Sequence, residues 1–311
     1  MKIFLDSGAF SAFHNNTSVN IQEYIDFIKE NKSSIETYAN LDEIGSPEGT
    51  WKNQEEMERQ GLNPIPVYHL GEPHSYLDRC MKYPYFAVGG IASKLTSQKA
   101  LSDYLSTLFR KVCPKSNDFY PICKVHGFGI ATPTLLITYP WYSADTTSWV
   151  QYGRYGIVLV PRKINGQMRY DVSPYTVAIS SRSKAVGDAE HFNNMAKEIQ
   201  DEIKSYFDRI GCPIGKIMHR LVDMDYKLQE DEKWVDKKNP VKIGPDKIED
   251  AKNKTPVIQK LRVEKIMEKG LCCDGDMRDK VNLQYFLDLE KHQGKYPRRW
   301  PWEEGIKSLP F

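Results

Sequence analysis

Short apolar segments alternate with longer polar or amphipathic segments along the first 180 residues of the chain. Each apolar segment is rich in β-branched or aromatic residues and ends close to Gly, Asp or His, as buried strands do before a loop. Such segments with helical stretches between them predict an α/β protein, a (β/α)8 TIM-like barrel. We expect eight strands, at residues 3–5, 37–41, 65–68, 85–88, 123–126, a short one that reaches Asp145, 157–160 and 175–179.

Two segments between the expected strands begin as helices do. Ile25 and Ile28 lie at helical spacing after Asn20, a residue type that caps helices. Pro133 follows Thr132 at what would be the first helical position, where proline is favoured. Parallel strands need a crossover connection, usually a helix, so these segments fit the predicted barrel.

The pattern changes after residue 184. We therefore expect the barrel core in residues 1–184, and in residues 185–311 a helical C-terminal part that either completes the barrel or is appended to it. Residues 227–254 are dense in Lys, Asp and Glu and have few apolar anchors, which is typical of a solvated insert. Apolar spacing predicts helices over 192–207 with a stop at Gly211, over 256–269 and over 276–292.

Composition narrows the class of protein. Of the 311 residues, 40% are apolar and 27% are charged, so the chain can fold around a core. No window holds 18 uninterrupted apolar residues, and no hydrophobic leader follows Met1-Lys2. We therefore expect a protein without a membrane span that stays in the cytoplasm.

The six cysteines include no Cys-x-x-Cys pair. The only close couple is Cys272-Cys273, and adjacent cysteines chelate a metal poorly even with His292 added. We expect reduced thiols and no metal. The chain also has no phosphate-binding loop and no dinucleotide fingerprint, so no cofactor is expected.

Basic residues are concentrated in one stretch. The whole chain has a formal net charge of +2, whereas residues 151–184 hold six basic residues and one acidic residue. Such a stretch is usually a solvated face, but the tyrosines interleaved with it make it our candidate surface for phosphate contacts. The residues to test are Arg154, Arg162, Lys163, Arg182 and Lys184. The basic tail at 298–302 is expected to dock its two tryptophans on the barrel instead.

The expected strand ends carry the candidate chemistry. Asp6, Asp42 and Asp145 each follow a strand, and Gly89-Gly90 and His126-Gly127 close two others. The carboxyl ends of parallel barrel strands meet at one rim, so these residues should converge. Two carboxylates that face one pocket can divide the work, one as ionised nucleophile and the other as proton donor to a leaving group.

The glycines and the third carboxylate indicate the type of ligand. Glycines let a flat ligand approach the backbone, and a carboxylate can accept two hydrogen bonds from the N1–H and the amine of guanine. These residues therefore indicate chemistry at a sugar–base bond. Each also has an ordinary structural role, because Asp6 before Ser-Gly suits a turn and the glycine pairs suit bends.

Five motifs in this order resemble the tRNA-guanine transglycosylase superfamily, most of all its phage and bacterial members that put 7-deazaguanines into DNA. The match spans roughly residues 3–150. The motifs are Asp-Ser-Gly-Ala-Phe, Asp-Glu, Val-Gly-Gly-Ile-Ala, His-Gly-Phe-Gly-Ile-Ala-Thr-Pro and Ser-Ala-Asp-Thr-Thr-Ser-Trp.

The resemblance implies a role for each matched residue. Asp145 would be the nucleophile that attacks C1′ and holds the sugar covalently, and Asp6 would be the general acid/base for the departing and incoming bases. Asp42 would read the guanine edge, and the other substrate-binding positions would be Ser7, Phe10, His69, Gly89, Gly90, Ile91, His126 and Gly127. Of these, His69 stands either for a base contact or for packing, and His126 is pocket wall.

Two departures bear on the polymer that is modified. The tRNA enzymes carry a Cys-x-Cys-x-x-Cys and a His that bind zinc, which have no counterpart after Asp145, and this chain begins almost at its first aspartate motif. Both elements support tRNA binding or dimerisation in the relatives. The resemblance therefore implies double-stranded DNA with the target base flipped out, a free 7-deazaguanine such as 7-cyano-7-deazaguanine, no cofactor and, for a phage-encoded enzyme, the host cytoplasm.

Three other functions fit the same residues. A tRNA-guanine transglycosylase would use the same pocket on RNA. A glycosylase would release the base with water in place of the incoming base. A non-catalytic DNA-binding subunit of a modification system would use the basic surface to bind DNA and would not catalyse base exchange. Product analysis on DNA and tRNA, with and without the deazaguanine, separates them.

Overall fold

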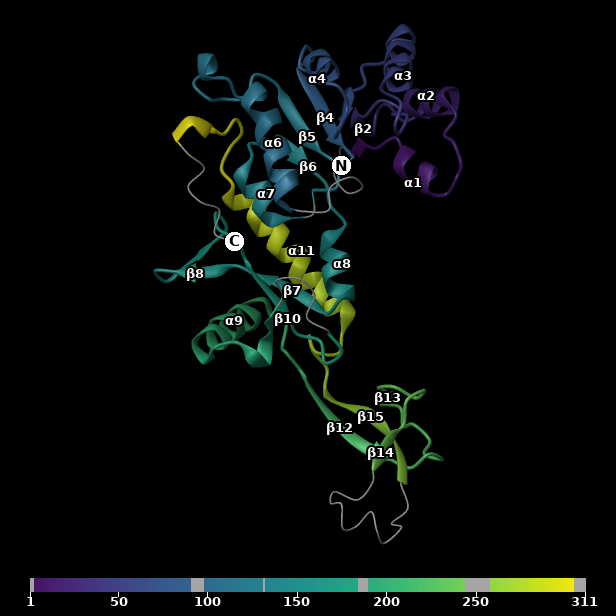
Figure 1. The fold of residues 1–311 in the computed structure, drawn as a ribbon, viewed down its shortest axis with the longest axis vertical. Coiled ribbons are helices and arrows are strands. Elements are labelled where there is room, and N and C mark those ends of the chain that lie inside the picture. The colour runs from purple at the N-terminus through teal and green to yellow at the C-terminus, as the bar shows by residue number, and fades with distance from the viewer. Residues whose placement is uncertain (1–2, 91–97, 131, 184–189, 244–257, 305–311) are drawn as a thin grey trace. The chain divides into compact units, whose positions relative to one another are not determined.

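The computed structural model describes residues 3–90, 98–130, 132–183, 190–243 and 258–304. The chain forms two compact units. The ribbon in Figure 1 is coloured by residue number, so the segments of each unit can be followed along the chain. Unit 1 comprises residues 1–148, 171–173 and 292–311, and unit 2 comprises residues 149–170 and 174–291. This division differs from the expected one after residue 184, because the chain leaves unit 1 shortly after Asp145 and returns to it at its C-terminal end.

Unit 1 is built on six parallel strands that pair in sequence order. β1 pairs with β2, an isolated parallel bridge joins Ala39 to Ile65 just before β3, and β3 to β6 form one sheet. All six overlap the strands that the sequence predicts. Their bounds are β1 Ile3–Leu5, β2 Ile35–Tyr38, β3 Val67–His69, β4 Tyr85–Gly89, β5 Lys124–Gly127 and β6 Ser143–Ala144.

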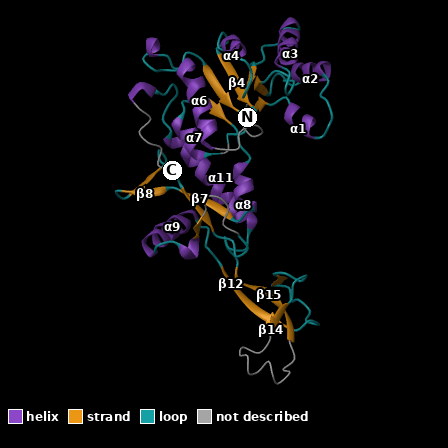
Figure 2. Cartoon of the chain, in the orientation of Figure 1, coloured by secondary structure: helices purple, strands orange, loops and turns teal. Residues whose placement is uncertain are grey.

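Helices connect these strands, as Figure 2 shows in purple against the orange strands. The Asn20 side chain accepts the backbone N–H groups of Gln22 and Glu23 and so caps α2, and Pro133 begins α7. Both helix starts confirm the prediction. The helices are α1 Ala9–His14, α2 Ile21–Glu30, α3 Pro47–Arg59, α4 His74–Cys80, α6 Gln98–Val112 and α7 Pro133–Thr138, with a 3-10 turn at Lys115–Asn117.

The C-terminal segment of unit 1 docks on the core of that unit. Trp300 is only 7% exposed and belongs to a cluster with Phe109 and Tyr139. The Trp302 indole N–H, in the short helix Trp302–Glu304, donates to the carbonyl of Cys113 at 2.9 Å. The expectation that the tail docks its tryptophans is therefore confirmed.

Unit 2 has a small sheet covered by helices. β10 pairs antiparallel with β7 and parallel with β11. Asn282 of α11 is fully buried, donates to the carbonyl of Ile157 and accepts the N–H of Leu159, which ties the helix to β7. The elements are α8 Ser148–Arg154, which starts in unit 1, β7 Ile157–Val160, β8 Arg162–Ile164, β9 Gln167–Arg169, β10 Tyr175–Ala178, β11 Glu190–His191, a 3-10 turn at Phe192–Asn194, α9 Lys197–Ile210 and α11 Gly275–His292.

The parallel arrangement expected for the last two barrel strands is wrong. β7 and β10 lie where the strands at 157–160 and 175–179 were expected, but they run antiparallel. Asn165 and Gly166 both adopt positive φ between β8 and β9, the conformation of a two-residue hairpin turn that reverses the chain. The segment between β7 and β10 therefore holds a hairpin and no crossover helix.

The C-terminal part is not helical throughout. Residues 258–268, which were expected as a helix, form β15 (Ile258–Glu268) of a four-stranded antiparallel sheet with β12 (Lys216–Val222), β13 (Glu232–Trp234) and β14 (Val241–Ile243). Leu261 and Val263 alternate with exposed Arg262, a spacing of two residues that buries both side chains on one face of a strand. The expected insert thus contributes two strands to this sheet.

The class of the protein is therefore mixed α/β with a parallel sheet. Among the described residues, no strand pair joins β6 to β1, so a closed barrel is not formed by the pairings observed. No helix in the described part of the chain is long and apolar enough to cross a membrane.

Candidate functional site

The carboxyl ends of the parallel strands bring three aspartates together in unit 1. Asp6 follows β1, Asp42 lies four residues beyond β2, and Asp145 follows β6. The charges of Asp42 and Asp145 both act on the Asp6 carboxyl. The three aspartates thus follow strands as expected and their charges interact, although no closed barrel is seen.

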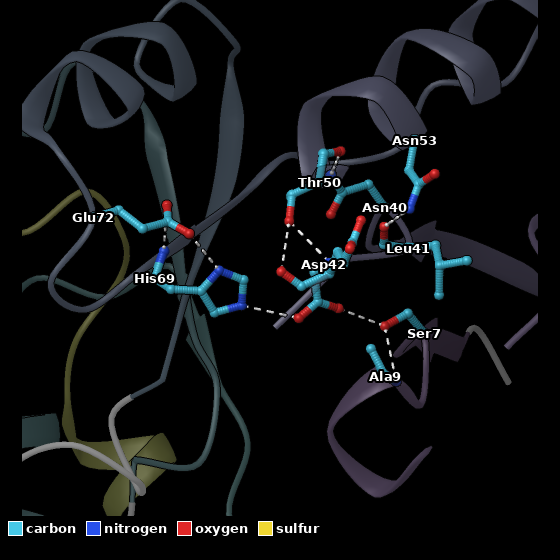
Figure 3. A network of polar contacts seen from close by, with 10 residues as sticks. Ser7, Ala9, Asn40, Leu41, Asp42, Thr50, Asn53, His69 and Glu72 are labelled. Carbon is cyan, nitrogen blue, oxygen red and sulfur yellow. Dashed lines mark hydrogen bonds and ion pairs between the residues drawn. The ribbon is translucent and has the colours of Figure 1, made fainter. Parts of the chain in front are cut away.

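Hydrogen bonds hold both oxygens of Asp42 (Figure 3). The Ser7 hydroxyl donates to Oδ1 at 2.8 Å, and Nε2 of His69 lies 2.9 Å from Oδ2. Ser7 itself is buried and accepts the backbone N–H of Ala9 at 3.3 Å. Ser7 therefore links the loop after β1 to the carboxylate after β2.

Helix α3 anchors the loop that carries Asp42. The Asn53 side-chain amide donates to the carbonyl of Leu41 at 2.8 Å, and the N–H of Glu43 donates to Thr50 Oγ1 at 2.9 Å. The Asn40 side-chain amide also donates to the carbonyl of Thr50, at 3.3 Å. Figure 3 shows these contacts on the helix side of Asp42. The position of Asp42 is therefore fixed by backbone contacts on both sides of it.

His69 lies buried between two carboxylates. Its Nδ1 is 3.0 Å from Glu72 Oε1 and its Nε2 is 2.9 Å from Asp42 Oδ2, while Glu72 Oε2 accepts the N–H of His69 at 3.1 Å (Figure 3). Burial by itself lowers the pKa of His69, but the hydrogen bonds to Asp42 and Glu72 raise it to about 9. At neutral pH the ring is an imidazolium with both N–H groups donated to protein. Of its two expected roles, the structure supports packing and charge pairing and leaves no ring nitrogen for a base.

The pKa of the Asp6 carboxyl is raised. Desolvation raises it most, followed by the negative charge of Asp42, and Asp145 adds to the effect, while the N–H groups of Ser7 and Gly8 oppose it. This shift arises although Asp6 is an exposed residue. Asp6 is therefore the carboxyl of this group that takes up a proton more readily than an ordinary aspartate does.

Asp145, like Asp6, is exposed. Its side chain is 59% exposed, and its Oδ1 accepts the N–H of Gly129 at 3.1 Å. Nε2 of His126 lies 3.4 Å from the same oxygen, without the geometry of a hydrogen bond. The backbone of Asp145 is held by β5, since its N–H donates to the carbonyl of Gly127 at 3.2 Å. Asp145 thus combines a fixed backbone with a carboxylate that solvent reaches.

Packing and backbone conformation account for the predicted glycines. A Cβ at Gly89 would lie 3.0 Å from the His69 ring, and one at Gly127 would lie 2.5 Å from Ile130. Gly90 adopts a φ of +74°, which favours glycine. Phe10 is 46% exposed on α1 with its ring edge-on to His14, and Ile91 lies outside the described residues.

The predicted basic residues belong to unit 2 and do not form one free surface. Arg162 stacks on the Tyr175 ring at 4.2 Å, and the Arg182 guanidinium lies 3.6 Å from the buried carboxylate of Glu264. Arg154 and Lys163 have exposed side chains. Lys184 lies outside the described residues.

Sequence reasoning missed three polar residues of the site. Glu72 pairs with His69 across a tight turn, and the spacing of three residues between them was the available signal. Ser143 and Tyr85 lie on the Nδ1 side of His126. Ser143 Oγ is 2.7 Å from His126 Nδ1 and 2.6 Å from the Tyr85 hydroxyl. Nothing local to Tyr85 marks it, because it meets Ser143 only through the pairing of strands.

The arrangement can perform acid–base and nucleophilic chemistry. The exposed carboxylate of Asp145, the exposed carboxyl of Asp6 with its raised pKa and the doubly held carboxylate of Asp42 all follow parallel strands of unit 1. Among the residues that the structure describes, no group of three or more His, Cys, Asp or Glu side chains is placed to hold a metal ion.

Comparisons with protein-family models, with curated proteins and with solved structures found no match to this chain.

Proposed function

We propose that this chain is a DNA-guanine transglycosylase, which exchanges guanine in DNA for a 7-deazaguanine through a covalent aspartyl–deoxyribose intermediate. The observation that carries the proposal is the convergence of three aspartates in three different environments. Asp145 and Asp6 are both exposed, but only Asp6 of the two has a raised pKa, and both oxygens of Asp42 accept hydrogen bonds from protein. Glycosyl transfer with retention needs such a division between a nucleophile and an acid/base.

The first half-reaction removes guanine. A carboxylate oxygen of Asp145 forms a bond to C1′ while the C1′–N9 bond breaks, and the electron pair of that bond passes to guanine. Asp6 donates its proton to the departing base, for which its raised pKa suits it. The products of this step are free guanine and a sugar ester on Asp145.

The second half-reaction inserts the new base. Asp6, now ionised, takes the proton from the incoming 7-deazaguanine, whose ring nitrogen attacks C1′. The bond between C1′ and Asp145 breaks, and its electron pair returns to the carboxylate. The exchange therefore leaves both aspartates as they began and consumes no cofactor.

Asp42 binds the guanine edge in this proposal. Each of its oxygens accepts one bond from protein and retains capacity for another, so the carboxylate can accept from N1–H and from the exocyclic amine. His69 and Ser7 orient Asp42 and do not contact the base. The imidazolium of His69 also compensates the Asp42 charge beside Asp6.

We also propose that the substrate is duplex DNA and that the fold of unit 1 is related to a barrel. The target nucleotide would be flipped out of duplex DNA, because C1′ cannot be attacked inside the stack. Exposed Arg154 and Lys163 are the described basic residues best suited to phosphate contacts. The six consecutive parallel strands of unit 1 support a barrel of the (β/α)8 type.

A base-releasing glycosylase is the second candidate. The observation that favours it is the 59% exposure of the Asp145 side chain, because water that reaches the sugar ester could hydrolyse it. The two functions differ only in what enters after guanine has left.

The test measures release of labelled guanine from duplex DNA, single-stranded DNA and tRNA, each with and without 7-cyano-7-deazaguanine. We expect release from DNA that requires the deazaguanine. Asp145→Ala should abolish release and the covalent adduct on a denaturing gel, and Asp6→Asn should slow release by about 10²- to 10⁴-fold. Asp103→Asn, a change to an exposed aspartate on α6, is the matched control and should act as wild type.

Each other outcome contradicts a named part of the proposal. Release without the deazaguanine would assign a glycosylase, and release from tRNA alone would assign the tRNA branch. A covalent adduct in Asp145→Ala would remove Asp145 as nucleophile. Unchanged DNA binding with no release from any polymer would assign a non-catalytic subunit.

A further inference from the structure

His126 presents a buried nitrogen to the proposed nucleophile. The residue is 3% exposed, and its Nε2 has no hydrogen-bond partner although it lies 3.4 Å from Asp145 Oδ1. Buried polar atoms in native proteins are nearly always paired, and an unpaired one costs about 1–3 kcal/mol. This nitrogen therefore needs a hydrogen-bond partner, and the Asp145 carboxylate is the polar group that lies beside it.

The other side of the ring is fixed. Nδ1 lies 2.7 Å from Ser143 Oγ, which lies 2.6 Å from the Tyr85 hydroxyl. The Phe4 ring stacks on the imidazole at a centroid distance of 4.3 Å, and Phe128 meets it edge-on at 4.6 Å. The ring therefore cannot turn away from Asp145 without losing both its hydrogen bond and its stacking partner.

The contacts of the ring favour one position for the proton. An unprotonated Nε2 would place its lone pair 3.4 Å from a carboxylate oxygen, which is repulsive, so we assign the hydrogen to Nε2. Either hydroxyl of the Tyr85–Ser143 pair can donate, and when Tyr85 donates to Ser143 and Ser143 donates to Nδ1, a neutral ring has its hydrogen on Nε2. A charged ring carries hydrogens on both nitrogens, so the assignment of Nε2–H holds in either state.

Two donors thus face one oxygen of Asp145. The Gly129 N–H donates to Oδ1 at 3.1 Å, and His126 Nε2 faces the same Oδ1 at 3.4 Å. Among the described contacts, none reaches Oδ2. The two oxygens of this carboxylate are therefore not equivalent.

We propose that His126 is a positioning residue that, with the Gly129 N–H, holds Oδ1 of Asp145 and leaves Oδ2 as the atom that attacks C1′. This inference rests on the proposed function. Oδ2 forms the bond to C1′ as the C1′–N9 bond breaks, and Oδ1 becomes the carbonyl oxygen of the ester. In the second half-reaction the C1′–Oδ2 bond breaks, its electron pair returns to Oδ2, and the two donors again hold the carboxylate.

The first test reads the ring directly and needs no activity. Nitrogen-15 NMR of the full-length protein with labelled histidine, assigned by loss of the His126 signals in His126→Gln, should show His126 Nε2 protonated. His69 serves as internal reference, since both of its nitrogens should be protonated at neutral pH. An unprotonated Nε2 in His126 would overturn the proposal whatever the enzyme does.

The second test separates positioning from folding. His126→Leu should slow single-turnover formation of the covalent adduct by about 10- to 100-fold with little change in the KM for DNA, because the donor acts on orientation and not on binding. His126→Gln keeps an N–H donor near Oδ1 and should recover most of that rate. Ser143→Ala should fall between wild type and His126→Leu.

The control is another buried hydroxyl in unit 1. Ser106 is 7% exposed and lies 2.9 Å from the Tyr139 hydroxyl, away from the aspartates, so Ser106→Ala should leave the adduct rate unchanged. An unaffected His126→Leu, equal losses in His126→Leu and His126→Gln, or an effect confined to KM would overturn the role of His126 alone. A wild-type protein that forms no adduct on DNA or tRNA would overturn the proposed function and this role with it.

Discussion

His69 illustrates how a single buried side chain sets the charge state of the candidate site. Its side chain and those of Asp42 and Glu72 are 6%, 12% and 7% exposed, so the three charges interact with little solvent screening. A lone imidazolium in such a place would lose its proton, but two carboxylates outweigh the desolvation. The site therefore carries one compensating positive charge beside three aspartates.

The raised pKa of His69 predicts how stability depends on pH. The folded pKa is about 9 and the unfolded value is 6.5, so the stabilisation is fully present below pH 6.5 and is lost as the pH rises to 9. At about 1.4 kcal/mol per pKa unit, the loss amounts to about 3 kcal/mol. Urea unfolding at pH 6 and pH 9.5 should show this loss in wild type.

Variants of His69 isolate that contribution. His69→Gln leaves the two carboxylates without their cation and should cost about 3–5 kcal/mol at pH 6, with a smaller difference from wild type at pH 9.5. His74→Gln, a change to an exposed histidine at the start of α4, is the control and should follow wild type at both values. A difference between wild type and His69→Gln that grows with pH would contradict the assigned charge.

At the scale of elements, the turn between β5 and α7 joins the proposed nucleophile to the core. Gly127 ends β5 and accepts the N–H of Asp145 through its carbonyl. A Cβ on Gly127 would lie 2.5 Å from Ile130 and 2.9 Å from Trp141, both buried. The close approach of these side chains to the strand end therefore requires glycine.

Gly127→Ala should destabilise the protein by about 1–3 kcal/mol through overpacking and should also displace Asp145. Thermal unfolding followed by circular dichroism measures the first effect, and guanine release measures the second. Gly275→Ala is the control, since its nearest neighbour would lie 3.8 Å from the new Cβ and we expect a change within about 0.5 kcal/mol. Equal stability of the two variants would contradict the packing argument.

The local sequence pattern predicts some features of helices and strands correctly and others not. The stop of α9 at Gly211, with φ +65°, and the capping of α2 by Asn20 depend on neighbours within one helical turn, and both were predicted. The helix predicted over residues 256–269 is wrong for residues 258–268. Antiparallel pairing with β12, which is distant in sequence, makes this segment a strand. Asn165-Gly166 is a local signal for the hairpin between β8 and β9, since both residues adopt positive φ there.

At the scale of the whole molecule, the chain passes from unit 1 to unit 2 and back. Residues 292–311 return to unit 1, where Trp300 packs against Phe109 and the Trp300 N–H donates to the carbonyl of Phe119 at 2.9 Å. The last segment therefore completes a core whose strands lie more than 150 residues earlier, and unit 1 cannot finish folding before the C-terminal segment is made.

Trp300→Ala should destabilise unit 1 by about 3–5 kcal/mol and leave unit 2 nearly unchanged. Native-state hydrogen exchange gives the measurement, because the amides of β3 to β5 should lose protection while those of β7 and β10 keep it. Leu283→Ala, on the exposed side of α11, is the control and should change neither group. Equal loss of protection in both units would show that they unfold together.

The sequence by itself determined the six parallel strands, the helix starts at Asn20 and Pro133, and the placement of three aspartates at strand ends. These features depend on residues a few positions apart, so local pattern suffices. Only the tertiary structure decided that β7 and β10 run antiparallel, that Glu72 and Asp42 enclose His69, and that His126 and Gly129 face one oxygen of Asp145. Apart from the His69–Glu72 pair, which is three residues apart, each of these depends on groups from distant parts of the chain that strand pairing or packing brings together, so sequence spacing does not reveal them.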